Sequence, residues 1–268
     1  MSGANSISLM SLLMASSLVL ITLFFSYWQK LNLEKEVIIS AIRAVIQLLA
    51  VGFLLDYIFG YQNPIFTALL MLFMIINASY NAAKRGKGIN KGFVISFIAI
   101  GSGTIITLSV LIFSGILKFV PNQMIPVGGM IISNSMVAIG LCYKQLLSEF
   151  RSKQEEVETK LALGADILPA SIDIIRDVIK TGMVPTIDSA KTLGIVSLPG
   201  MMTGLILAGT SPIQAVKYQM MVTFMLLATT SIASFVATYL AYKIFFNNRK
   251  QLVVTKDLFI LINSMLVW

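Results

Sequence analysis

Residues 92–119 read GFVISFIAIGSGTIITLSVLIFSGILKF, and this stretch decides the fold class. Its one charged residue, Lys118, lies close to its end. An apolar run of about 20 residues can cross the hydrocarbon core of a bilayer as a helix, because a helix satisfies its backbone hydrogen bonds internally. The stretch therefore predicts a transmembrane helix.

The composition of the whole chain agrees with this stretch. Hydrophobic residues make up 57% of the 268 residues and charged residues only 12%, whereas a soluble domain carries about 25% charged residues. This excludes soluble, fibrous, disordered and disulfide-stapled proteins. The chain has no His and a single cysteine, Cys142. Internal disulfides, zinc sites of the Cys/His type and His-based catalysis are therefore excluded, and we do not expect an enzyme.

The hydrophobic pattern predicts an all-α polytopic membrane protein with about seven transmembrane helices. The first segment resembles a signal peptide, but no basic residue precedes it and its apolar run is too long, so we treat it as a retained span. The predicted spans are residues 7–28, 37–59, 64–83, 92–119, 124–147, 192–209 and 212–246.

Basic residues indicate the orientation of these spans. They concentrate after the first, third, fifth and seventh segments, and positive charge marks the cytoplasmic side of a membrane protein. This predicts an N-terminus outside, a C-terminus inside and a multi-pass protein of the cell (inner) membrane. The net charge of +8 then reflects this asymmetry and the anionic lipid of the inner leaflet, with no nucleic acid as partner.

The inner segment between the fifth and sixth spans is unusually long and charged. Residues 148–191 hold eight of the twelve acidic residues, and we interpret them as a cytoplasmic helical insertion that docks another protein. The pattern predicts one helix over residues 154–164 and another over residues 171–180, ended by Gly182 and Pro185. The second helix is amphipathic, and it either lies on the membrane surface or faces a partner.

One motif in this insertion resembles a known signature. The run Glu158-Thr-Lys-Leu-Ala-Leu-Gly164-Ala165 is similar to the EAA signature of ABC-transporter permeases, which forms the helix that fits a cleft of the ATP-binding subunit. This resemblance makes Glu158, Ala162, Gly164 and Ala165 candidates for coupling to an ATPase.

A second motif is more specific. The run Gly194-Ile-Val-Ser-Leu-Pro199-Gly200-Met-Met-Thr-Gly204 resembles the FetB-type iron-export permease family of ABC transporters, as do the stretches at residues 43–49, 126–135 and 215–219. The chain departs from the family pattern at Leu205, where Gln is expected, and at Asp188, where Asn is usual.

The resemblance implies a permease homodimer that exports iron with an ATP-binding cassette subunit as partner. This chain has no G-x-x-x-x-G-K-[ST] phosphate loop, so we expect ATP to bind in the partner and no cofactor to bind here. Residues 1–250 would form a single transmembrane permease domain, with 148–191 as the coupling insertion. The tail at residues 251–268 has no assigned role.

Polar and sulfur-bearing side chains within the spans are candidates for the substrate path. Such residues either hydrogen-bond between helices or line a path, and methionines either fill apolar space or bind soft metals. No His and no carboxylate near the middle of the membrane is available for a bare ferrous ion, so the metal ligands are unknown. The path candidates are Gln47, Asn77, Asn134, Met201, Met202 and Thr203.

The Gly200-x-x-x-Gly204 spacing allows two helices to approach closely. With Pro199, these glycines are candidates for the dimer contact or for a gate. The main alternative function is a secondary transporter of a small solute, which needs coupling carboxylates at the middle of the membrane. A retinal protein and a membrane scaffold without transport activity are weaker alternatives.

Overall fold

The computed structural model describes residues 9–61 and 63–253, and the described residues form helices joined by turns, without strands. Of the predicted tail over residues 251–268, residues 254–268 lie outside the described part of the chain. The chain divides into two compact units, of which the first contains α1 (Leu9–Ser16), α2 (Leu18–Trp28) and α3 (Glu34–Tyr61). The second unit contains α4 to α9 as far as Ile206, and then α10 and the residues that follow it from Thr210 onward. Residues 207–209 are grouped with the first unit.

In the first unit, α2 packs against α3. The turn between them is closed by the buried Ser26, whose hydroxyl donates to Glu34 Oε1 at 2.7 Å. The described part of the predicted span 7–28, residues 9–28, forms two helices with a break at Ser17, so it is not the single helix that we expected.

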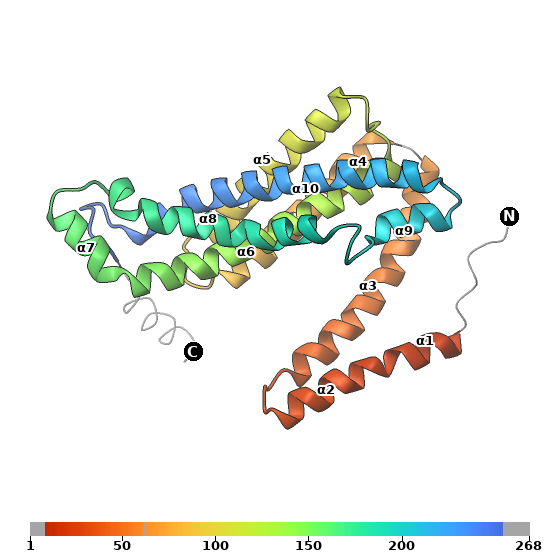
Figure 1. Ribbon diagram of the computed structural model, residues 1–268, viewed down its shortest axis with the longest axis horizontal. Coiled ribbons are helices and arrows are strands. Elements are labelled where there is room, and N and C mark those ends of the chain that lie inside the picture. The colour runs from red at the N-terminus through yellow and green to blue at the C-terminus, as the bar shows by residue number, and fades with distance from the viewer. Residues whose placement is uncertain (1–8, 62, 254–268) are drawn as a thin grey trace. The chain divides into compact units, whose positions relative to one another are not determined.

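The second unit is a helical bundle around α6 (Pro121–Ser152), which contacts α4 (Pro64–Arg85), α5 (Gly92–Phe113), α8 (Ile167–Thr192) and α10 (Pro212–Ala241). Figure 1 shows α6, α8 and α10 side by side, with α7 (Gln154–Ala162) at one end of α6 and α8. A 3-10 turn, η1 (Tyr242–Phe245), follows α10.

Five helices of the described chain are long and apolar enough to cross a membrane. They confirm the prediction of an all-helical protein with several spans. They are Glu34–Leu55, Pro64–Arg85, Gly92–Phe113, Pro121–Ser152 and Pro212–Phe245.

The predicted sixth span, residues 192–209, is not a continuous helix. Helix α8 ends at Thr192, and the short α9 (Gly200–Leu207) begins after a non-helical stretch over residues 193–199. Gly194 has a φ of +79°, and the Thr192 carbonyl accepts the N–H groups of residues 195 to 197 at 3.0–3.4 Å. Because Pro199 has no N–H to donate, a helix cannot run through this turn without losing a hydrogen bond.

The predicted end of the helix over residues 171–180 at Gly182 and Pro185 is wrong, and of its two interpretations the one that places it on the membrane surface does not hold. Helix α8 runs through Gly182 and Pro185 to Thr192, and its residues Ile174, Ile175 and Val178 are buried in the core of the bundle. The apolar face that suggested membrane contact thus packs against other helices.

Gly182 serves close packing rather than helix termination. A Cβ at this position would collide with Cys142 Sγ and lie 2.7 Å from Ser234 Oγ and 3.3 Å from the carbonyl oxygen of Ala138. These atoms belong to α6 and α10, so the glycine lets α8 approach both helices. Packing here overrides the local tendency of glycine to end a helix.

We expect Gly182→Ala to destabilise the bundle. The added methyl group must push α8 away from two helices, and overpacking of this kind costs about 1–3 kcal/mol. Gly101→Ala is the matched control, because a Cβ at Gly101 meets nothing within 4 Å. Thermal unfolding of both variants in detergent measures the difference, and equal midpoints would contradict this account of Gly182.

Candidate functional site

A cavity of about 230 Å³ lies beside the non-helical stretch over residues 193–199, between the end of α8 and the start of α9. A second cavity of about 90 Å³ adjoins it, since the two share Asn134, Thr186, Ser189 and Leu226. The walls come from α6, α8, α10, the interruption and the start of α9. The lining residues of the larger cavity are Met130, Asn134, Thr186, Ser189, Ala190, Leu193, Pro199, Gly200, Met201, Gln219, Val222, Thr223 and Leu226.

Five polar side chains line this cavity: Thr186 and Ser189 of α8, and three of α6 and α10 whose hydrogen bonds define its chemistry further. Asn134 Nδ2 donates to the Met130 carbonyl at 2.8 Å, and Thr223 Oγ1 donates to the Gln219 carbonyl at 2.9 Å. Gln219 Oε1 is buried and accepts no hydrogen bond from the residues that the structure describes. A buried acceptor without a partner is rare in proteins, and it often marks a place for water or a ligand.

The structure brings together some of the predicted path residues. Asn134 and Met201 line the larger cavity, together with Pro199 and Gly200, which we had predicted for the gate or dimer contact. Met202 and Thr203 also belong to α9 but are not among the lining residues of the cavity. The Thr203 hydroxyl donates to the Pro199 carbonyl at 3.0 Å.

Two further path candidates are not brought to this cavity. Asn77 is exposed on α4, where its amide nitrogen donates to the Phe73 carbonyl at 3.2 Å. Gln47 is exposed on α3, in the other compact unit. Sequence reasoning missed Gln219 and Thr223, although a glutamine within the apolar run of α10 was a usable signal.

Gly200 and Gly204 have open surroundings. A Cβ added at either position would meet no atom of the described chain within 4 Å. No helix of the second unit packs closely against these glycines in the described chain.

The second candidate site is the surface around α7. Helix α7 is anchored by the buried Val157, while Glu158 and Ala162 are exposed. Helix α6 has 32 residues and is about 48 Å long at 1.5 Å per residue, which exceeds a hydrocarbon core of about 30 Å. At least one end of α6 must therefore extend beyond that core, and α7 follows directly on its C-terminal end.

The end of α7 has the geometry that the sequence predicts. The Ala165 N–H donates to the Lys160 carbonyl at 3.0 Å, and Gly164 has a φ of +92°. This is the left-handed ending in which glycine is favoured. Leu163, just before this turn, is 83% exposed. The predicted helix over residues 154–164 with a terminating glycine is confirmed.

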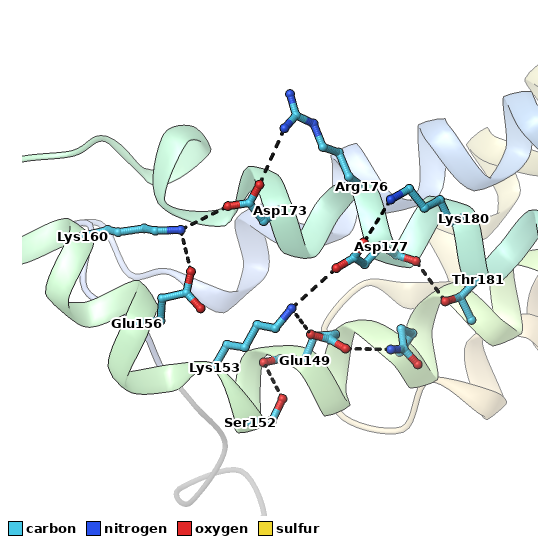
Figure 2. A network of polar contacts seen from close by, with 11 residues as sticks. Glu149, Ser152, Lys153, Glu156, Lys160, Asp173, Arg176, Asp177, Lys180 and Thr181 are labelled. Carbon is cyan, nitrogen blue, oxygen red and sulfur yellow. Dashed lines mark hydrogen bonds and ion pairs between the residues drawn. The ribbon is translucent and has the colours of Figure 1, made fainter.

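Ion pairs hold α6, α7 and α8 together (Figure 2). Lys153 Nζ lies 2.8 Å from Glu149 Oε2 and 3.6 Å from Asp177 Oδ2. Lys160 Nζ lies 2.7 Å from Glu156 Oε1 and 3.2 Å from Asp173 Oδ2. Each lysine thus bridges its own helical segment to α8.

The two ion pairs of Lys160 change its pKa. Hydrogen bonds to Glu156 and Asp173 raise the pKa of the Lys160 ammonium above its usual value. Exposed pairs of this kind contribute little stability individually, so the two bridges add to the packing of the buried Val157, which anchors α7.

A cleft of about 610 Å³ runs beside α7. It is lined by all four residues that we predicted for ATPase coupling, Glu158, Ala162, Gly164 and Ala165, and by residues 249–252, which the sequence did not indicate. Lys250 Nζ lies 2.9 Å from Asp166 Oδ1 and thereby attaches this segment to the start of α8. Its hydrogen bond, together with that from the Ile167 N–H, lowers the pKa of the Asp166 carboxyl.

No metal centre of the usual kind is present in the described part of the chain. No group of three or more His, Cys, Asp or Glu side chains there could hold a metal ion. The chemistry of both candidate sites is therefore that of neutral polar groups at the cavity and of charged side chains at the α7 surface.

Comparisons with known proteins place the chain among membrane proteins. The family model described as "Uncharacterised protein family (UPF0014)" matches residues 9–246. The "Probable iron export permease protein FetB" of Escherichia coli (strain K12) is 51% identical over 95% of this chain and 98% of that protein. The "UPF0014 membrane protein YjkA" of Bacillus subtilis (strain 168) is 38% identical over 91% of this chain and 97% of that protein. The "Protein ALUMINUM SENSITIVE 3" of Arabidopsis thaliana is 37% identical over 87% of this chain and 86% of that protein. No solved structure matches the chain significantly.

Proposed function

Because the chain belongs to the UPF0014 family of membrane proteins, we propose that it is the permease subunit of an ABC transporter, which exports a metal ion by using ATP hydrolysed in a separate subunit. Iron is the proposed metal, since a relative with 51% identity over nearly the full length bears the name of a probable iron export permease. In this proposal the chain is not an enzyme and binds no cofactor, and ATP binds in the partner.

The observation that carries this proposal is the surface around α7. A short helix with an exposed face follows directly on the longest helix of the described chain, and it is bridged to α8 by Lys160, while Lys153 bridges the α6–α7 junction to α8. A load applied to α7 would therefore pass into the bundle through α6 and α8. This is the mechanical arrangement that a coupling helix requires.

The proposal includes an arrangement in the membrane. The five apolar helices, α1 with α2, and the interrupted segment over residues 192–209, which contains α9, together give seven crossings, with the N-terminus outside and the C-terminus inside. Interrupted helices are tolerated within membranes where they line a protein cavity, and this interruption borders the 230 Å³ cavity. Residues 1–250 then form one permease domain of the cell (inner) membrane, with residues 148–191 as its coupling insertion.

Asn134 and Met201 line the substrate path in this proposal, and Met202 and Thr203 lie beside it on α9. Gln47 and Asn77 are proposed for parts of the path that lie outside the cavity. Pro199, Gly200 and Gly204 contribute to the contact between two permease copies or to the gate. The open surroundings of both glycines leave room for such a contact.

Isolation of the chain from its own membrane tests the partnership. We expect a tagged chain, solubilised in mild detergent, to retain a subunit that binds and hydrolyses ATP. The same preparation from cells that produce an unrelated tagged membrane protein is the control. A chain that is purified in a folded state without any ATP-binding subunit would favour the alternative, a secondary transporter.

A further inference from the structure

The cavity at the α8–α9 interruption presents acceptor oxygens. The Met130 carbonyl can only accept a hydrogen bond, so the atom of Asn134 that faces it at 2.8 Å must be the amide nitrogen. This leaves Asn134 Oδ1 as the remaining acceptor of that side chain. Thr223 likewise uses its single hydroxyl proton on the Gln219 carbonyl, and only its lone pairs remain.

Gln219 Oε1 adds a third acceptor. It is buried in the lining of the cavity without a hydrogen-bond partner among the described residues. Leaving a buried acceptor unsatisfied is unfavourable, and a bound donor would recover this free energy. Three oxygens from adjacent turns of α10 and from α6 can thus accept hydrogen bonds, and the Thr186 and Ser189 hydroxyls of the same lining can accept or donate.

The same wall is unsuited to a bare metal ion. None of its lining residues is charged, and no cluster of His, Cys, Asp or Glu in the described residues could replace the hydration shell. Removing that shell without charged ligands is very costly. A hydrated ion avoids this cost, because its water molecules donate hydrogen bonds outward.

The size of the cavity agrees with a hydrated ion. Its volume of about 230 Å³ equals that of roughly seven to eight water molecules at about 30 Å³ each. A divalent ion with six water molecules therefore fits, and water-mediated contacts are energetically close to direct ones.

We propose that the cavity binds a divalent metal ion with its hydration shell intact, and that Asn134 Oδ1, Gln219 Oε1 and Thr223 Oγ1 accept hydrogen bonds from the bound water. This inference rests on the proposed function and specifies the form in which the metal passes. The thioethers of Met130 and Met201 then shape the wall and do not ligate the ion.

Hexaamminecobalt(III) provides the decisive probe. Its six ammonia ligands donate hydrogen bonds as the water of a hydrated ion does, but they do not exchange, so protein atoms cannot reach the metal. We expect it to compete with ferrous ion for the purified chain in anaerobic calorimetric titrations. Ferrous binding that hexaamminecobalt(III) leaves unchanged would overturn the inference.

Three variants localise this binding. Gln219→Leu and Asn134→Leu should each weaken binding of both ions about three- to tenfold, as expected for the loss of one hydrogen bond. Gln219→Glu should tighten both, since it adds a negative charge to the same wall. Ser133→Ala is the control, because this hydroxyl is exposed and donates to the Met130 carbonyl from outside the cavity lining.

The outcomes separate this inference from the proposed function. If the chain transports iron with ATP but hexaamminecobalt(III) does not compete with ferrous ion, the proposed function stands. The binding of a hydrated ion in the cavity is then rejected. Unchanged affinity in all three variants also rejects the site. Transport at subsaturating ferrous ion that is reduced in Gln219→Leu but retained in Ser133→Ala, with competition in the wild type, supports it.

Discussion

Ala162→Trp is expected to reduce ATP-driven transport at least about a hundredfold while the membrane bundle stays folded. Ala162 is exposed on α7 and lines the cleft beside it, so an indole there adds bulk at the surface and replaces no buried side chain of the bundle. In a groove of the ATP-binding subunit it would prevent close contact, and a loss of about 3 kcal/mol of docking energy corresponds to this factor.

Ala162 is a sharper test than the neighbouring glycine. Gly164 has a φ of +92°, so any side chain there strains the turn itself and would confuse docking with folding. Lys87→Trp is the control, since Lys87 is exposed in the turn between α4 and α5. Co-isolation of the ATPase and transport in vesicles are both measured. Wild-type transport in Ala162→Trp would contradict docking on α7 and would favour the exposed side of α8 as the docking surface.

Gly204→Leu is expected to abolish transport and to weaken self-association of the permease. Gly200 and Gly204 lie one turn apart on α9 with nothing of the described chain within 4 Å. Only glycine lets two helix backbones approach closely in a membrane, so a leucine would hold two copies apart without disturbing the fold of either.

The control for this variant is Gly101→Leu, whose added side chain also enters open space but on α5. A cysteine at Leu207, which is 78% exposed on α9, should cross-link to its symmetry mate in the wild type and not in Gly204→Leu. Full transport and unchanged cross-linking in Gly204→Leu would place the dimer contact elsewhere.

The sequence predicts those elements that are determined by local chemistry. The five apolar helices follow from length and hydropathy alone. The end of α7 follows from Gly164, because the left-handed turn needs that residue. The residues proposed for coupling gather at one cleft for the same reason, since all four belong to this one short segment.

Elements that depend on tertiary contacts were not predictable in this way. Gly182 and Pro185 indicate a helix end by local propensity, but burial of Ile174, Ile175 and Val178 sustains α8 through both. Gln219 could equally have bonded to a neighbouring helix. Only the packing of α6, α8 and α10 shows that its Oε1 is buried and has no hydrogen-bond partner among the residues that the structure describes.

ATP-driven iron movement in reconstituted vesicles tests the central claim most directly. The chain and its ATP-binding partner are placed in vesicles with ferrous ion on the side of α7, and metal transfer is followed with ATP, without ATP, and with an ion gradient alone. The account predicts transfer only with hydrolysable ATP. Transfer driven by the ion gradient without ATP would contradict it and identify a secondary transporter.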